Sequence, residues 1–280
     1  MIYFRFIAII IFCFFSACQS SDKKAEKQTQ QTVTYLSEMQ GDWVLMEYVQ
    51  ALKNHQTPEK AAKVLNGWVE LVIEEDAALK DSVRVFASYN NHEGQTFFMP
   101  KKGEKGKLFL LVEGRTEQDT IFLTYHPQKQ EIALWDKKEM QQARIFQRVE
   151  IPLPERKETA ERGLETTKIE VGDGIRSLAS QLIVGEYVHF SSPEKTIAFT
   201  PTGEITGLSG YEHYELLTDF NDALDSCDYL MLFTNKYQVA KKIYAIDLEN
   251  PPFSLFETVE DRKSGILKKG KKIGELKKRE

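Results

Sequence analysis

Cysteine is scarce in this chain of 280 residues, and its placement limits what the thiols can do. Only three cysteines occur, and two of them, Cys13 and Cys18, lie near the N-terminus. Cys227 is therefore the only thiol in the body of the chain, which excludes a framework of intramolecular disulfides there. A lone cysteine in a folded body is most often a small buried apolar side chain.

Long apolar runs are also missing. The N-terminal run from Ile7 to Phe15 covers nine residues, whereas a helix needs about 20 to cross a bilayer. Arg5 is the only charged residue before Asp22. A basic start, a short apolar core and the small pair Ser16-Ala17 indicate a secretory signal, not a membrane helix.

Cys18 directly follows that small pair. The arrangement resembles the bacterial lipobox, in which the thiol is diacylated and the preceding peptide, here 1–17, is removed. Phe15 stands where Leu is usual, a replacement frequent in lipoproteins of the Bacteroidetes type. Because Gln19 is not Asp, the resemblance implies an outer-membrane lipoprotein, and two acyl chains give stable anchoring. The alternative is an ordinary cleaved signal with an incidental cysteine.

Basic charge is sparse outside the C-terminus. Residues 261–280 hold nine Lys or Arg against three acids, so residues 1–260 carry a net charge of −11 within the total of −5. An acidic chain with a short basic end argues against duplex DNA as a partner. We expect the basic tail to be a solvated, partly frayed end. The alternative is an electrostatic contact with anionic lipid or glycan at a membrane surface.

No catalytic constellation is evident in the sequence. Ser209 in GLSGY does not fit a nucleophile elbow, and no glycine loop for phosphate occurs. His189 and His213 fall in neighbouring strand regions and could approach each other, but neither has a metal-binding spacing. The remaining histidines are His55, His92 and His126. We therefore expect a protein that is not an enzyme and has no metal or cofactor.

An acidic row precedes one of the expected strands at a spacing of three. On a helical turn these carboxylates would share a face and could attract a hard cation such as Ca²⁺. The EF-hand pattern fails, since Ala223 and Leu224 stand where a ligand and the glycine belong. We favour a solvated loop. The row consists of Asp219, Asp222, Asp225 and Asp228.

Two polar segments divide the chain. In residues 18–36, Cys18 is followed by QSSDKKAEKQTQQT. This segment has no large apolar residue before Val33 and predicts a flexible tether. Residues 151–176 contain two prolines, many charges and two glycines, and predict a linker. These boundaries leave two folded domains, 37–150 and 177–280.

An internal repeat relates the two domains. Gly41-Asp42-Trp43-Val44 recurs as Gly185-Glu186-Tyr187-Val188. DTIFLTY, from Asp119, matches DYLMLFT, from Asp228, and RIFQRVE, ending at Glu150, matches SLFETVE, ending at Glu260. The matches come in the same order, which predicts two tandem copies of one fold.

Short β-branched and aromatic runs between turn clusters predict a strand-rich fold. One helix is expected, with Thr57 as N-cap, Pro58 at its first position and a stop at Asn66-Gly67. The first copy predicts strands at 42–50, 68–74, 82–89, 95–99, 107–113, 119–126, 131–135 and 144–150. The second predicts 184–190, 195–200, 204–208, 212–217, 228–234, 241–247, 253–259 and one more in the basic tail.

About eight antiparallel strands per copy predict two up-and-down β-barrels, because closure removes exposed sheet edges. The strands KLFLLVE and YLMLF are apolar on both faces. Both of their faces must be covered. Packing of the two barrels on each other is the simplest explanation, and a partner protein or a lipid is the alternative.

The pattern resembles the lipocalin-like (calycin-type) lipoproteins of bacteria, through Gly41-x-Trp43 at the start of an up-and-down strand series. The resemblance implies that Trp43 closes one barrel end, with Arg144 or Arg148 packed on its ring. Gly185 and Tyr187 take this place in the second copy, where SLFETVE has no basic residue. It also implies a small apolar ligand or lipid in the barrel. The alternative is a structural or protein- or glycan-binding module of the envelope with barrels filled by side chains.

Overall fold

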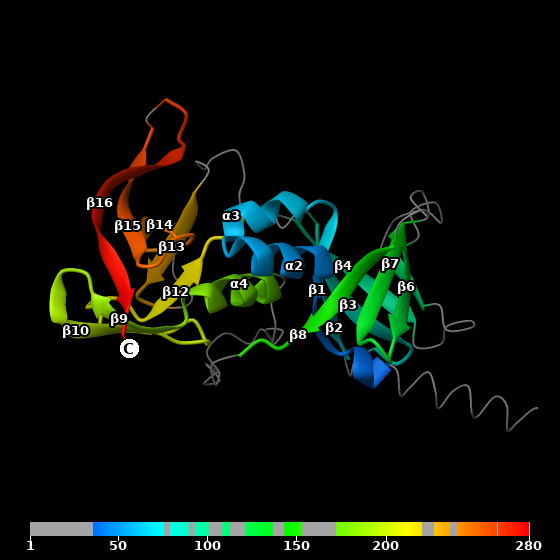
Figure 1. Cartoon of the computed structure of the whole chain (residues 1–280). Coiled ribbons are helices and arrows are strands. Elements are labelled where there is room, and N and C mark those ends of the chain that lie inside the picture. The colour runs from blue at the N-terminus through cyan, green and yellow to red at the C-terminus, as the bar shows by residue number, and fades with distance from the viewer. Residues whose placement is uncertain are drawn as a thin grey trace, which may run out of the picture.

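The computed structural model describes residues 36–75, 79–89, 93–100, 108–112, 121–136, 143–152, 172–219, 227–235, 240–261 and 263–279. They form a mainly β protein of two antiparallel sheets, with three α-helices between them (Figure 1). The expected fold class is thereby confirmed. No helix within the described ranges combines the length and apolar character needed to span a bilayer.

The first sheet is a closed eight-stranded barrel in which each strand pairs with the next. Its strands are β1 (Gly41–Leu45), β2 (Trp68–Glu74), β3 (Ser82–Tyr89), β4 (Glu93–Pro100), β5 (Leu108–Val112), β6 (Ile121–His126), β7 (Glu131–Asp136) and β8 (Arg144–Val149). The barrel closes where β1 pairs with β8, with Trp43 opposite Arg148. Closure leaves no free edge in this sheet.

The second sheet has eight strands in the order β11-β10-β9-β16-β15-β14-β13-β12. They are β9 (Gly185–His189), β10 (Ser192–Phe199), β11 (Ile205–Thr206), β12 (His213–Leu216), β13 (Asp228–Phe233), β14 (Lys242–Asp247), β15 (Phe253–Glu260) and β16 (Leu267–Lys278). Its two end strands meet at a single bridge between Glu204 and His213, so this sheet also curls into a barrel. Below, the two sheets are called barrel 1 and barrel 2.

One expected strand is wrong in its second half. Residues 46–50 belong to α2 (Met46–His55), which directly follows β1. Tyr48, Val49 and Leu52 are its buried residues, and they share one face at helical spacing. A short apolar stretch fits either period, so the sequence alone did not distinguish strand from helix here.

The helix expected at Thr57 is confirmed. The Thr57 side chain accepts a hydrogen bond from Lys60 N at 3.3 Å, and Pro58 opens α3 (Pro58–Ala61). A 3₁₀ turn, η1 (Ala62–Val64), follows, and Gly67 adopts a φ of 71° before β2 begins. Such a left-handed conformation favours glycine, which explains the stop.

The basic tail is not a frayed end. Residues 267–278 form β16, the strand that joins β15 to β9 in barrel 2. Tyr229 Oη donates to the Leu267 carbonyl oxygen at 2.7 Å and ties the start of this strand to β13. The strand expected in the tail is therefore confirmed. The expectation of a frayed end is wrong because charge dominates the composition, while Ile273 and Leu276 supply the apolar side chains that face inward.

The structure contains two eight-strand units, but two of the three sequence matches that predicted a repeat are off by one strand. β8 closes barrel 1 against β1, and its counterpart against β9 is β16. RIFQRVE in β8 was therefore paired with the wrong strand, since SLFETVE lies in β15. Likewise DTIFLTY contains the sixth strand of its unit and DYLMLFT contains the fifth. Similar local composition in neighbouring strands produced the shift.

α4 (Asp173–Ser180) begins inside the segment expected as linker and lies between the two barrels with α2 and α3 (Figure 1). Ile175 is fully buried in the core of barrel 1, and Ala179 is fully buried in the core of barrel 2. Leu182, in the following turn η3 (Gln181–Ile183), packs against both cores. The helix thus joins the two hydrophobic cores.

β13 is buried on both faces, as its apolar sequence predicted. The side chains of β5, in KLFLLVE, lie outside the described residues.

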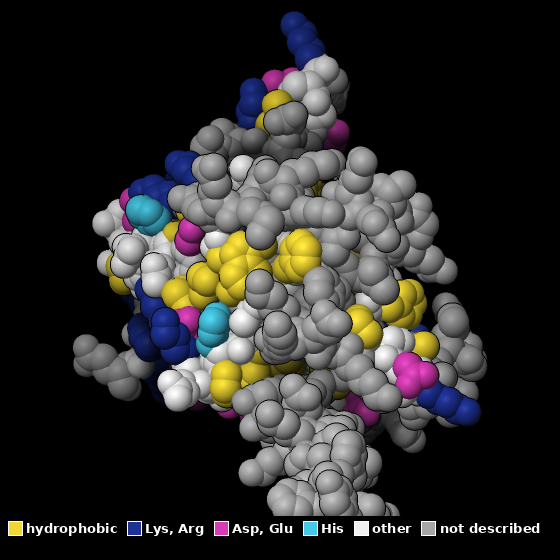
Figure 2. Space-filling model, turned by 90° about the vertical axis from the view of Figure 1, so that its right-hand side faces the viewer, with side chains coloured by type: hydrophobic (Ala, Val, Ile, Leu, Met, Phe, Trp, Pro, Cys, Tyr) yellow, Lys and Arg dark blue, Asp and Glu magenta, His cyan; other side chains and the backbone are white. Residues whose placement is uncertain are grey.

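At the other end of the molecule, the face of barrel 1 turned away from barrel 2 shows apolar side chains among residues outside the description (Figure 2).

Candidate functional site

The described inward side chains of barrel 1 fill its interior. Fully buried residues with no exposed surface include Trp43, Leu71, Phe97, Leu123 and Phe146, contributed by five different strands. Burial of each large apolar side chain contributes roughly 1.5–3 kcal/mol to folding. An eight-stranded barrel is just wide enough for such a packed core, so these residues occupy the space that a ligand would need.

Trp43 belongs to this core. Its ring Nε1 donates to the Met39 carbonyl oxygen at 2.7 Å, in the helical turn that precedes β1. The indole meets Tyr125 edge-on, with ring centroids 5.9 Å apart. The hydrogen bond satisfies the one polar atom of the buried indole, which is what a buried tryptophan requires.

Arg144 and Arg148, of which one was expected on the Trp43 ring, each have a contact elsewhere. Arg148 lies over Gly41, with its Nε 3.3 Å from the place where a Cβ would stand. Arg144 Nη1 donates to the Trp68 carbonyl oxygen at 2.8 Å. Gly41 has a φ of 123°, a conformation that disfavours any side chain.

Barrel 2 repeats this geometry with different residues. Gly185 has a φ of 144°, and the Lys278 side chain lies over it as Arg148 lies over Gly41. Lys278 is paired with Tyr187 across β16 and β9, as Arg148 is paired with Trp43. The sequence predicted a further strand in the basic tail but did not single out Lys278, because SLFETVE of β15 was matched to β8.

Two buried carboxyl groups lie at the junction between the barrels. Asp42 and Glu70 lie on the same face of the β1–β2 ladder, where Val44 pairs with Glu70 and Asp42 with Val72. They are 1% and 0% exposed. Both Asp42 carboxyl oxygens and Glu70 Oε2 have no hydrogen-bond partner among the described residues. Such groups are costly to bury as anions.

Burial explains the protonation behaviour of this pair. Loss of solvent raises the pKa of Glu70 to about 7, and it raises the pKa of Asp42 well above its ordinary value, with the nearby Glu70 charge adding to the effect. Two acids in contact in a low dielectric favour sharing a proton over carrying two charges. Asp173 raises the Asp42 pKa further, and Arg176 lowers it.

Each barrel also caps a helix that belongs to the other half. Glu70 Oε1 accepts from Gly174 N of α4 at 2.8 Å. Asp228 Oδ1, at the start of β13, accepts from Glu59 N of α3, also at 2.8 Å. The first N–H groups of a helix have no partner within it, so both carboxyl groups satisfy donors that would otherwise be orphaned. These reciprocal caps connect the two halves.

Asp228 belongs to the acidic row that we expected to form a solvated loop. It is instead 5% exposed, and burial raises its pKa to about 7. Asp219 lies at the end of a described segment, while Asp222 and Asp225 lie outside the described residues. Within the described ranges, no group of three or more acidic, histidine or cysteine side chains is arranged to hold a metal ion.

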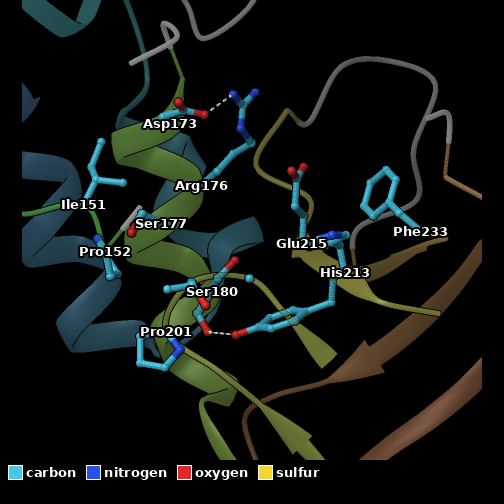
Figure 3. A pocket seen from close by; sticks show the side chains of 13 residues that line it. Ile151, Pro152, Asp173, Arg176, Ser177, Ser180, Pro201, His213, Glu215 and Phe233 are labelled. Atoms are coloured by element: carbon cyan, nitrogen blue, oxygen red, sulfur yellow. Dashed lines mark hydrogen bonds and ion pairs between the residues drawn. The ribbon is translucent and has the colours of Figure 1, made fainter. Parts of the chain in front are cut away.

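A pocket opens beside α4 (Figure 3). Its cavity volume is about 70 Å³. Asp173, Arg176, Ser177 and Ser180 line it from one face of α4, and His213 and Glu215 line it from β12. Arg176 Nη2 donates to Asp173 Oδ1 at 2.8 Å, and Figure 3 shows Glu215 opposite this pair. The pocket is small and carries charges of both signs.

His189 of β9 and His213 of β12 were expected in neighbouring strands. The sheet order does not make these strands neighbours, because β10 and β11 stand between them. His189 stacks on Phe190, with centroids 4.9 Å apart, and contacts Ser191. His213 lies in the pocket instead. Cys227, expected to be buried, is half-buried just before β13. Cys18 and the rest of the N-terminal segment before residue 36 lie outside the described residues.

Comparison with protein-family models, with curated proteins and with solved structures gives no match to this chain.

Proposed function

We propose that this chain is a non-enzymatic, lipid-anchored protein of the cell envelope, in which two side-chain-filled barrels form a scaffold for binding another protein or a glycan. The observation that carries the proposal is the filled interior of barrel 1, where Trp43, Phe97 and Phe146 have no exposed surface. A barrel packed in this way offers its outer surface and loops for recognition.

The continuity of the two halves supports a scaffold. Leu182 packs against both hydrophobic cores, and the reciprocal caps Glu70–Gly174 and Asp228–Glu59 cross the junction. An ion pair between Lys60 and Glu249 adds a contact at 2.5 Å, although an exposed pair contributes little. A partner that contacted both barrels would meet a surface of defined geometry.

Crosslinking in intact cells, followed by purification from membranes, tests the proposal. Recovery of a stoichiometric protein or glycan with the chain is the expected result. Replacement of exposed residues on either barrel should abolish that recovery without changing thermal stability. Recovery of the monomer alone, with an extractable lipid, would contradict the scaffold function.

The anchor is tested separately at Cys18. In the lipobox that this segment resembles, the thiol carries the acyl chains, so Cys18→Ala should give an unprocessed or soluble chain. Cell fractionation and mass spectrometry of the N-terminus measure the outcome, with Cys13→Ala as the matched control. A processed Cys18→Ala chain that still fractionates with membranes would contradict the anchor.

A second candidate function is binding of a small apolar molecule or lipid inside a barrel. The closed meander of eight strands favours it, since this architecture can enclose one small ligand. Delipidated protein should then take up a fluorescent fatty acid at a saturable site. Enlarging the interior with Phe97→Ala should increase uptake, and the absence of saturable binding by both proteins would remove this candidate.

A further inference from the structure

The β15–β16 hairpin carries a cluster of lysines on one projecting element. Figure 1 shows it rising from barrel 2, in orange and red. Six lysines of β16 are exposed to solvent, and four of them lie in its first half: Lys268, Lys269, Lys271 and Lys272. Since residues 1–260 carry a net charge of −11, this hairpin is electrostatically distinct from the rest of the protein.

The hairpin has an unpaired edge. On the side of β9, only Lys277 and Lys278 of β16 pair with a strand, so 267–276 have no strand partner there among the described residues. Lysines along such an edge discourage pairing with the strand of another chain. The edge is therefore suited to a flat anionic surface and unsuited to strand addition.

Part of the local acidic charge is already neutralised. Lys268 forms an ion pair with Asp261 at 2.8 Å, and Lys272 pairs with Glu275 at 2.7 Å. Lys269 lies 3.8 Å above the centroid of the Phe256 ring. These contacts hold the side chains near the strand surface while their ammonium groups remain accessible.

The end of the hairpin adds an apolar component. Val259 is 55% exposed, one of two large hydrophobic side chains that are exposed among the described residues. Ile266 and Leu267, near the turn, are half-buried. A few apolar side chains flanked by lysines fit the interface of a bilayer, where ammonium groups meet phosphates and apolar atoms enter the headgroup layer.

We propose that the β15–β16 hairpin is a membrane-contact element that binds the surface of a bilayer containing anionic phospholipid. The inference rests on the membrane location in the proposed function. The sequence predicts a tether at 18–36, and a chain of this length spans at most roughly 60 Å. Such a tether would give barrel 2 room to turn the hairpin towards the bilayer. Contact of the hairpin would then fix the orientation of the scaffold.

The test is flotation of the full-length Cys18→Ala chain with vesicles. One set contains phosphatidylcholine alone, and the other contains in addition about one third phosphatidylglycerol. Binding to the anionic set should exceed binding to the neutral set and should weaken as salt is added. The N-terminal apolar run is common to every variant, so its contribution cancels in the comparison.

The decisive variant replaces Lys268, Lys269, Lys271 and Lys272 with Gln. Each lysine near an anionic surface is worth about 1 kcal/mol, so we expect affinity for anionic vesicles to fall at least about tenfold. The matched control removes the same charge from exposed positions elsewhere, at Lys53, Lys63, Lys129 and Lys195. It should bind within about twofold of the parent chain. An equal loss in both variants would overturn the proposal.

Two further variants test whether a loss of binding comes from misfolding and whether the true ligand is a soluble polyanion. Arginine at the same four positions keeps the charge and should keep binding. Val259→Ser should weaken vesicle binding but leave binding to heparin unchanged. A Val259→Ser chain with unchanged vesicle binding, or no preference of the parent chain for anionic vesicles, would overturn the proposal. Either result leaves the acyl anchor intact, because that is measured by fractionation of Cys18→Ala in cells.

Discussion

At the scale of single residues, the buried Trp43 ring and the buried Glu70 carboxyl group differ in whether the sequence reveals them. Trp43 could be selected from the sequence, because a glycine, one intervening residue and an aromatic residue open a strand series in each barrel-like unit. Glu70 could not, because its partner Gly174 lies 104 positions away. A glutamate within a strand has no local signal that separates a buried position from an exposed one.

Trp43→Phe should destabilise the protein through a single hydrogen bond and a small cavity. The change leaves the buried Met39 carbonyl without its donor, at a cost of about 1–3 kcal/mol. Thermal or urea unfolding measures the loss. The counterpart Tyr187→Phe removes a hydroxyl that has no hydrogen bond to another described residue, and it should change stability by less than about 0.5 kcal/mol. Equal effects would show that the Met39 bond is unimportant.

Gly174→Ala should also destabilise, although alanine is the better helix former by about 1 kcal/mol. A Cβ at this position would stand 2.8 Å from Val44 Cγ2 and still nearer to Asp42 Oδ1. α4 would have to move away from β1, at a cost of about 1–3 kcal/mol. Denaturant unfolding should show the loss, while Ser177→Ala on the pocket side of α4 serves as the control. A stabilised Gly174→Ala would mean that α4 does not pack against β1.

At the scale of elements, pattern and turn residues predicted most of the strands. Alternating apolar residues and turn clusters located all eight strands of each barrel, because those signals are local. The errors have one physical origin, which is that tertiary partners decide between local alternatives. Met46–Gln50 joins a helix that packs on barrel 1, and a lysine-rich end becomes β16 because β9 and β15 lack another neighbour between them.

Truncation after Asp261 tests the role of β16. The deletion removes the strand that stands between β15 and β9, so barrel 2 should lose its cooperative unfolding and expose apolar surface. Differential scanning calorimetry and a dye that binds exposed apolar surface measure both effects. Removal of Glu280 alone is the control and should have no effect. A truncated chain with unchanged unfolding would restore the interpretation of a frayed tail.

At the scale of the whole molecule, the junction connects the two barrels, and its chemistry could not be predicted from either repeat alone. The sequence indicated that doubly apolar strands need a cover. It did not indicate that the cover would include helices capped by carboxyl groups of the opposite half. Those caps combine residues from β2 with α4 and from β13 with α3, and only the folded arrangement brings them together.

The protonation of these caps predicts how stability depends on pH. Glu70 and Asp228 both have a pKa of about 7 in the folded protein, against ordinary values of 4.5 and 3.8. Between those limits the folded chain binds more protons than the unfolded chain, so the free energy of unfolding falls as pH rises. The stabilisation is fully present below about pH 4 and is lost as pH rises through about 7.

The melting temperature should therefore be lower at pH 8 than at pH 5.5, once other titrating groups are accounted for by a variant. Glu70→Gln provides it, because the amide oxygen can still accept from Gly174 N and the amide NH₂ can donate to Asp42. This variant should be more stable than the parent chain at pH 8 and should show a shallower pH slope. Glu47→Gln, on the exposed side of α2, removes a carboxylate without touching the junction and should keep the parent slope. If Glu70→Gln and Glu47→Gln behave alike, the junction does not bind the proton, and the two barrels are held together by apolar packing around α4 alone.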